Sequence, residues 1–216
     1  ENNAGLRTED GVLYSKDGTV LLAAPGAKSG VLNVLETTIK VEDNACNGCC
    51  EITEIKLPEG LLHIGNWAFD GCNNVTEDLW IPDTVEYIGH AAFAVDWGNF
   101  RNDLHLHLPE NLKILEDWAF ANRQYIDEVV IPDSLEQITG SEIFGIGSSG
   151  RITYECTNNV FSKWVSEYPH NLENLHLNKV HVPGNAVKEN VVDKTYDKVV
   201  YCVGCKEELS REKKNY

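Results

Sequence analysis

Methionine is absent from the chain, and the first residue is a glutamate. We therefore predict that the chain begins at the edge of a processed or trimmed protein, where a removed signal peptide would leave no trace. Long apolar runs are also absent, because the best candidate, Val20 to Ala27, is interrupted by Pro25 and Gly26. A membrane-spanning helix needs roughly 20 apolar residues, so we expect no membrane insertion.

Basic residues are scarce in the middle of the chain. Residues 34–155 carry 6 basic and 22 acidic side chains, whereas the two ends are nearly balanced, so this segment holds the whole formal charge of −16. An acidic surface of this size repels phosphate backbones and anionic headgroups. We therefore expect no binding to nucleic acid or to a membrane surface, while basic partners and cations remain open.

Motifs typical of enzymes are missing too. The chain has no Gly-x-Ser-x-Gly turn and no glycine-rich phosphate loop. A cysteine nucleophile would need a histidine and an orienting group in a cleft, but the seven histidines fall mostly on expected turns and strands. We expect a protein that is not an enzyme and holds no cofactor.

An internal repeat dominates the sequence. Five consecutive segments align, at residues 34–56, 57–80, 81–107, 108–130 and 131–155. Four open with an apolar residue, a proline and an acid, as in Ile81-Pro82-Asp83, and the first lacks only the proline. Each has an apolar residue at its eighth position, and three have phenylalanine at the thirteenth.

Most repeats close on a short run in which apolar and polar residues alternate, such as Leu104-His-Leu106-His-Leu108. This period of two predicts a half-buried strand. The next proline ends the pairing, and the acid after it is expected to accept hydrogen bonds from the following backbone amides. The remainder is long enough for about one turn of helix. Stacked in register, such units predict an α+β repeat solenoid with a continuous apolar spine.

A family resemblance rests on the phrase Ile-Pro-Asp-x-Val-x-x-Ile-Gly-x-x-Ala-Phe at residues 81–93 and on Gly71-Cys72 in the preceding repeat. The pattern resembles the BspA-like (treponemal-type) leucine-rich repeats of microbial surface proteins, over about residues 34–177. An insert at residues 95–102 and Glu142, where a small residue is expected, depart from it. The resemblance implies a secreted or cell-surface protein of recognition or adhesion, and it leaves the ligand open.

The two ends predict structures that cover the array. Asp17-Gly18 between apolar runs indicates a hairpin, so residues 1–33 are predicted to form an N-terminal β-hairpin cap. Apolar residues at helical spacing from Asn159 to Tyr168 predict a capping helix. The array of five repeats and this helix then spans residues 34–177, and residues 178–216 are predicted to be a small C-terminal β extension, with strands near 186–192 and 196–202.

The strand residues that point away from the core are expected to form the concave ligand-binding face of the array. They are Glu54, Lys56, Asp78, Trp80, His105, His107, Glu128, Val130 and Thr153. Exposed aromatic residues are enriched at binding hot spots, although Trp80 packed under a loop or cap is an equal alternative. A metal shared by His105 and His107 lacks a third ligand, so a solvated pair is preferred.

The seven cysteines are an odd number, so at least one thiol is unpaired within the chain. Cys49 and Cys72 occupy equivalent positions in adjacent repeats, where a buried ladder of thiols is favoured over a disulfide. A second candidate is a zinc site made of four residues near the C-terminus. Its ligands would be His176, His181, Cys202 and Cys205. The spacing matches no established zinc pattern, so a short-loop disulfide or free thiols at Cys202 and Cys205 are preferred and no metal is expected.

Three functional hypotheses follow. The first is a monomeric, secreted or surface-attached recognition protein that binds an extracellular protein or glycoprotein through the concave face. The second is a structural spacer or targeting scaffold of a larger secreted protein whose active domain lies outside this chain. The third, metal-dependent sensing through the terminal cysteines, predicts stoichiometric zinc.

Overall fold

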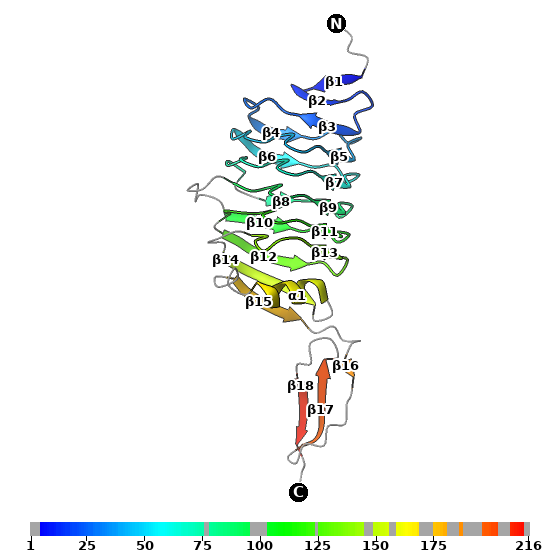
Figure 1. The fold of residues 1–216 in the computed structure, drawn as a ribbon, viewed down its shortest axis with the longest axis vertical. Helices are drawn as coiled ribbons and strands as arrows, with labels where there is room; N and C mark the ends of the chain where they lie inside the picture. Colours follow the sequence, from blue (N-terminus) through cyan, green and yellow to red (C-terminus); the bar gives the residue numbers. More distant parts are fainter. Residues whose placement is uncertain are drawn as a thin grey trace.

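The computed structural model describes the repeat array and parts of the C-terminal segment. The described residues are 5–75, 78–95, 103–123, 125–144, 149–155, 159–168, 175–180, 186–187, 196–202 and 208–213. The repeats stack into a column with β1 (Leu6–Glu9) at one end and β15 (Leu175–Val180) at the other (Figure 1). Two sides built of strands run along the column, and each repeat supplies one strand to each side.

The N-terminal end is an antiparallel hairpin. β2 (Val12–Ser15) pairs with β1 on one side and with β3 (Val20–Ala23) on the other, which confirms the hairpin predicted around Asp17-Gly18. In its turn, Asp17 Oδ1 accepts hydrogen bonds from Ser15 Oγ at 2.6 Å and from the Thr19 amide at 3.0 Å. These bonds, with Ser15 contributing most, lower the pKa of Asp17 to about 2.

The first sheet continues from this hairpin through the repeats by parallel pairing of two-residue strands. After β3 come β5 (Lys40–Val41), β7 (His63–Ile64), β9 (Tyr87–Ile88), β11 (Ile114–Leu115) and β13 (Gln137–Ile138). The apolar residue at the eighth position of each repeat points inward from these strands, and Val41, Ile64 and Ile88 are fully buried.

The second side of the column is built from longer strands. β4 (Gly30–Asn33) pairs with β6 (Ile52–Lys56) in one parallel sheet. A five-stranded parallel sheet follows, made of β8 (Asp78–Trp80), β10 (Asp103–His107), β12 (Tyr125–Ile131), β14 (Ser149–Glu155) and β15. Because β3 and β4 pair in parallel with repeat strands, residues 1–33 already contribute to both sides of the column.

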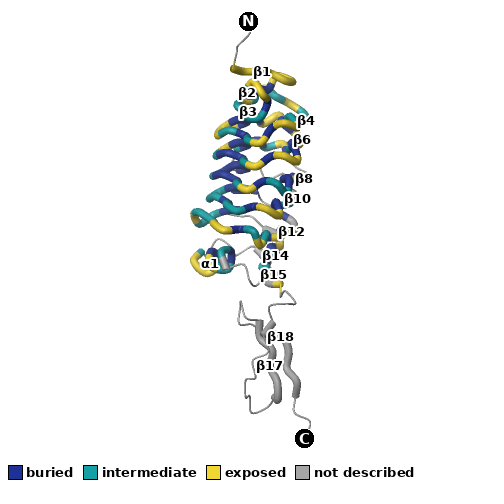
Figure 2. Tube along the Cα trace, turned by 90° about the vertical axis from the view of Figure 1, so that its right-hand side faces the viewer, coloured by how far each residue is buried: buried dark blue, intermediate teal, exposed yellow. Residues whose placement is uncertain are grey.

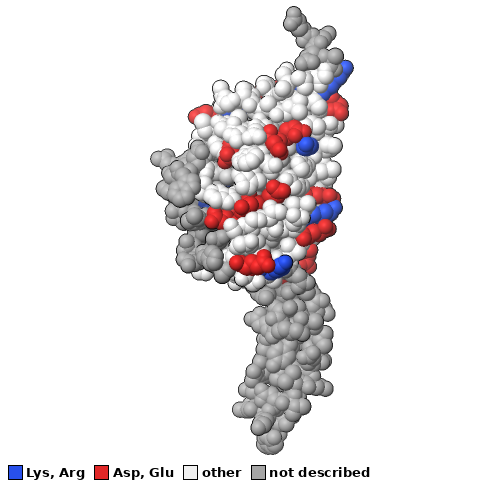
Figure 3. Space-filling view, in the orientation of Figure 1, with Lys and Arg blue, Asp and Glu red and all other residues white. Residues whose placement is uncertain are grey.

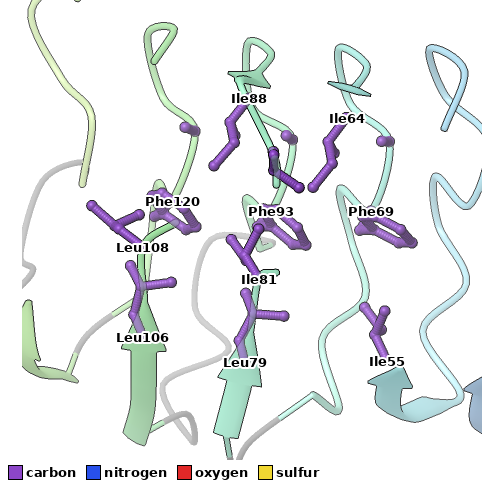
Figure 4. Close-up of a cluster of buried hydrophobic side chains, with 14 of the residues drawn as sticks. Ile55, Ile64, Phe69, Leu79, Ile81, Ile88, Phe93, Leu106, Leu108 and Phe120 are labelled. Atoms are coloured by element: carbon purple, nitrogen blue, oxygen red, sulfur yellow. The ribbon is translucent and has the colours of Figure 1, made fainter. Parts of the chain in front are cut away.

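The core between the two sides is a ladder of equivalent side chains. Phe69, Phe93 and Phe120 stack with ring centroids 5.1 and 5.6 Å apart, and Phe144 extends the stack at 6.2 Å. Figure 4 shows Phe69, Phe93 and Phe120 above Ile55 and the pairs Leu79–Ile81 and Leu106–Leu108. The buried positions recur at the same place in each repeat (Figure 2). No repeat buries its own apolar residues alone, so stability depends on stacking.

The turn of helix predicted in each repeat is not observed, and this is a correction. Residues 43–48, 66–71 and 117–122 form turns, and the one helix among the described residues is α1 (Asn159–Glu167). Each turn contains a residue with a left-handed backbone, such as Trp67 with φ of 52°. That conformation interrupts a right-handed helix. The fold is therefore a solenoid of strands and turns.

Side-chain caps join the turns of neighbouring repeats. Asn66 Oδ1 accepts a hydrogen bond from the His90 amide at 2.8 Å, and Asp43 Oδ1 accepts one from the Asn66 amide at 2.8 Å. This close stacking leaves no space beside Gly65 and Gly89. A Cβ on Gly89 would lie 2.7 Å from Asn66 Oδ1 and 2.8 Å from the Asn66 nitrogen.

The column is close to straight in Figure 1, unlike the curved array expected from the sequence. Helices pack about 8–10 Å apart, whereas paired strands lie about 4.8 Å apart. When each repeat has a helix on one side and a strand on the other, the repeats lie farther apart on the helix side, and the array curves. Here both sides are built of strands, hydrogen-bonded except between β6 and β8, so the two sides have similar spacing. The outward face of β6, β8, β10, β12, β14 and β15 is therefore called the strand face below.

Arg123 is a charged residue inside the column. It is 1% exposed and lies at the position that Cys49 and Cys72 occupy in earlier repeats. Its Nε donates to the Phe93 carbonyl at 2.9 Å, and a terminal nitrogen donates to the Val75 carbonyl at 3.3 Å. Burial lowers the pKa of Arg123 to about 10. The guanidinium thus joins the backbones of three repeats.

The C-terminal end has two observed parts. The predicted capping helix is confirmed as α1, which packs near β13 and donates a hydrogen bond from Trp164 Nε1 to the Gly140 carbonyl at 3.0 Å. Beyond β15, a three-stranded antiparallel sheet contains β16 (Ala186–Val187), β17 (Tyr196–Cys202) and β18 (Glu208–Lys213). Within the described ranges, no helix is long and apolar enough to cross a bilayer.

Candidate functional site

Parallel pairing brings the predicted binding residues together in two rows on the strand face. In one row, Asp78 lies opposite His105 and Glu128 opposite Arg151. In the other, Trp80 lies opposite His107 and Val130 opposite Thr153. Glu54 and Lys56 project from β6, which neighbours β8 without being hydrogen-bonded to it. The rows arise because alternate residues of a strand share one face.

Exposure of these side chains follows the alternation predicted from the sequence. Five of them are exposed: Glu54, Lys56, Trp80, Glu128 and Val130. His107 and Thr153 are partly buried. Asp78 and His105 occupy strand positions, but their side chains lie outside the described residues.

Trp80 and His107 form the aromatic centre of the strand face. Their rings are stacked with centroids 3.9 Å apart and an interplanar angle of 4°. Trp80 is 56% exposed, so the alternative that it packs under a loop or cap is not observed. His107 covers one face of the Trp80 indole. On its other side, β8 has no hydrogen bonds to the neighbouring strand β6.

Asp83 fixes the orientation of this stack. Its Oδ1 lies 3.1 Å from His107 Nε2 and accepts a hydrogen bond from the Glu110 amide at 3.0 Å. The pKa of Asp83 is lowered, mainly by the hydrogen bond from the Glu110 amide and to a smaller extent by the contact with His107. Asp83, the acid after Pro82, therefore accepts a hydrogen bond from an amide of the next repeat, and not from the amides that directly follow it as the sequence led us to expect. An anionic Asp83 holds the imidazole in place, which limits the entropy lost when a ligand contacts it.

Polar groups flank the aromatic centre on both sides. Lys56 Nζ lies 3.3 Å from Glu54 Oε1, and Thr153 Oγ1 donates to Glu128 Oε1 at 3.1 Å. Val130 between them is 61% exposed. An exposed apolar and aromatic centre with a polar surround is the arrangement of protein-binding hot spots.

Sequence reasoning missed three residues on this face. Arg151 pairs with His176 in the first row, and Asn178 pairs with Thr153 in the second. His176 and Asn178 belong to β15, which lies beyond the last aligned repeat. The alternating run Leu175-His-Leu177-Asn would have revealed this strand, because it has the same period as the repeat strands.

The four cysteines of the array that the structure describes are free thiols. Cys46, Cys49 and Cys72 are fully buried, and Cys50 is exposed. Burial raises the pKa of Cys72 to about 12, and its Sγ lies 3.5 Å from the Cys46 carbonyl oxygen. These positions agree with the predicted thiol ladder, in which the sulfur atoms fill core space.

The terminal zinc candidate is not assembled among the described residues. His176 is exposed on β15, whereas His181 and Cys205 lie outside the described residues, as does the side chain of Cys202. Across the parts of the chain that the structure describes, no group of three or more histidines, cysteines or acids is placed to hold a metal.

A cleft of about 240 Å³ lies between β13 and α1. Ile138, Val160 and Trp164 line its apolar part, and Glu136, Lys163 and Glu167 are among its polar residues. Lys163 and Glu167 face each other on the helix at 3.8 Å. This cleft brings together no nucleophile with a base, so its residues do not match a catalytic arrangement.

The acidic charge of the array is visible on the face in Figure 3. Asp and Glu side chains form several clusters across it, with only a few Lys or Arg side chains beside them. Sequence and strand pairing together define a leucine-rich-repeat solenoid whose described repeat residues form strands and turns.

The chain belongs to the BspA-type leucine-rich-repeat family, whose repeat region matches residues 31–149 in six copies. No curated protein sequence matches the chain. Among solved structures, the pneumococcal vaccine antigen PcpA is similar with a TM-score of 0.60 and 20% identity. The similarity covers 84% of this chain and 49% of PcpA, so the chain spans about half the length of that protein.

A second solved structure, a leucine-rich repeat protein from Eubacterium ventriosum, has a TM-score of 0.35 and 18% identity, with 68% of this chain and 51% of that chain covered. The likeness to PcpA establishes the fold, and the family match establishes the repeat type.

Proposed function

We propose that this chain is a non-enzymatic recognition module, secreted or attached to a cell surface, which binds an extracellular protein or glycoprotein through the strand face. The observation that carries the proposal is the exposed stack of Trp80 on His107, held by Asp83 and bordered by Val130. Large rigid aromatic groups bind with little loss of side-chain entropy. The similarity to a pneumococcal vaccine antigen supports a surface location.

The test is a binding screen against extracellular-matrix and plasma proteins, with the double variant Trp80→Ala and His107→Ala. A hot-spot pair is expected to contribute at least about 2 kcal/mol, so affinity should fall roughly 30-fold or more. Leu62→Ala is the matched control, because Leu62 is 45% exposed and lies next to β7 on the other sheet. Equal affinity of the double variant and the control would exclude the strand face as the binding site.

A second proposed function is that of a spacer in a larger secreted protein. It is supported by the straight column, in which β1 and β15 lie at opposite ends (Figure 1). The flanking gene sequence discriminates between the two proposals, because a spacer requires a further domain with its own binding or catalytic activity. A full-length product without such a domain would reject this role.

A further inference from the structure

Tryptophans occupy two of four equivalent turn positions in which the backbone is left-handed. These positions are Asn44, Trp67, Ala91 and Trp118, with φ of 59°, 52°, 50° and 61°. The amide at each position donates to a carbonyl of the next repeat, at 2.8 to 3.1 Å. The stacking of the repeats therefore imposes this conformation, whatever side chain is present.

Tryptophan is a poor choice for this conformation on structural grounds alone. Asparagine tolerates a left-handed backbone, whereas a bulky side chain there is strained. Core packing does not account for Trp67, because its side chain is 39% exposed. Residues kept in strained conformations cluster at functional sites. An exposed aromatic group on a strained turn thus points to binding.

Neighbouring side chains extend the aromatic surface across three repeats. The rings of His90 and Trp67 contact each other edge to face, with centroids 5.1 Å apart. Trp118, two repeats from Trp67, is partly buried against Ala91, Ala94 and Ala121. Because Trp67 and Trp118 occupy the same turn position with the same left-handed backbone, they lie on the same side of the array; Trp67 is exposed and Trp118 is partly exposed.

The charge around these tryptophans identifies the chemistry of the ligand. We define the turn rim as residues 42–48, 65–71, 89–95 and 116–122. It contains five acidic residues, Glu42, Asp43, Asp70, Glu116 and Asp117, and no lysine or arginine. Of the basic residues next to it, Lys40 pairs with Glu42 at 2.8 Å and Arg123 is buried.

We propose that the turn rim binds an arginine- or lysine-bearing segment of a partner protein. A cation is attracted to the face of an indole, and arginine is the more frequent partner. The surrounding carboxylates add an attraction that salt screens. Two repeats span about 10 Å along the array. This distance matches the roughly 9 Å between residues i and i+3 of an extended polyproline-type segment.

The test uses the complete chain and a short peptide, Gly-Arg-Pro-Pro-Arg-Gly, followed through the five tryptophan indole N–H signals in NMR spectra. The indole signals of Trp67 and Trp118 are expected to shift, and that of Trp80 to stay in place. A peptide with glutamate in place of both arginines should cause no shift. Added salt should weaken the arginine peptide's affinity.

Trp67→Asn is the decisive variant, because asparagine already occupies the equivalent position 44 and the fold should persist. The dissociation constant of the peptide is expected to rise at least threefold, while Trp80→Ala leaves it unchanged. Absence of shifts at Trp67 and Trp118, an equal response to the glutamate peptide, or an unchanged constant in Trp67→Asn would each overturn the proposal. None of these outcomes bears on ligand binding at the strand face.

Discussion

Replacing Gly89 by alanine tests the contact that fixes the distance between repeats. The added Cβ would lie 2.7 Å from Asn66 Oδ1, 2.8 Å from the Asn66 nitrogen and 2.8 Å from the Gly65 carbonyl carbon. Two of these atoms belong to the backbone, so a side-chain rotation cannot relieve the overlap. The two repeats must separate, or the Asn66 cap on the His90 amide must be lost.

The cost can be estimated from these contacts. Overpacking in a close-packed interior costs about 1–3 kcal/mol, and a lost hydrogen bond adds about 1 kcal/mol. The lower entropy of the unfolded alanine chain offsets about 0.4–1 kcal/mol. We therefore expect Gly89→Ala to lower the free energy of unfolding by about 2 kcal/mol. For a domain of this size, that corresponds to a decrease in Tm of about 4–8 °C.

Gly60→Ala is the matched control, because nothing lies within 4 Å of the Cβ that it would add. It should leave the stability unchanged or raise it by up to about 1 kcal/mol. Urea unfolding followed by circular dichroism measures both variants, and hydrogen exchange at the His90 amide reports the lost cap directly. If the two variants have the same midpoint and His90 remains protected, the proposed close packing between repeats is incorrect.

Four further predictions concern Arg123, the thiols and Trp67. Arg123→Ala should destabilise the chain by about 3 kcal/mol, measured by urea unfolding, because it leaves buried carbonyls without a donor. Brief thiol alkylation followed by peptide mass analysis should label Cys50 and not Cys72. The pKa of Cys72 in the folded chain, about 12, exceeds the ordinary value near 8.5. The buried neutral thiol therefore contributes stability that is present below pH 8.5 and is lost as the pH rises toward 12. Cys72→Ala should reduce this loss of stability at alkaline pH, measured by unfolding. Trp67→Asn should raise Tm by about 1–3 °C, because asparagine tolerates the left-handed backbone that Asn44 and Trp67 share. A lower Tm would show that tryptophan is not strained at this position.

The repeat and its strands were predictable because their signals are local and recur. Proline after each alternating run marks where a strand ends, and Asp17-Gly18 marks the hairpin turn. The apolar spacing from Asn159 predicted α1 to within a residue of its observed end. The outward positions of Trp80 and Val130 followed from alternation alone.

The turns were not predictable in the same way. Ile64, Ala68 and Phe69 have the spacing of one helical turn, and tryptophan carries no preference for a left-handed backbone. The conformation of Trp67 instead depends on its hydrogen bond to the next repeat, which a local pattern does not encode. The burial of Arg123 could not be predicted for a related reason. A charged residue is expected on the surface, and the carbonyls that bind Arg123 are distant in the sequence.

The strand face shows how far a site can be predicted from alternation. The pattern identified which residues share a face, but the stacking of Trp80 on His107 depends on the exact register of β8 and β10. An insert separates these strands in the sequence, so their register could not be counted along the chain. The contact of His107 with Asp83 was invisible for the same reason.

The ladder of hydrogen bonds between repeats also determines how the column responds to force. These bonds run along the column axis, since the strands lie across it (Figure 1). A pull between the two ends would load them one repeat at a time, as in the opening of a zipper, rather than all together in shear. Each released repeat of 23 residues would then lengthen the chain by about 80 Å. An attachment built from such a column would lengthen stepwise under tension.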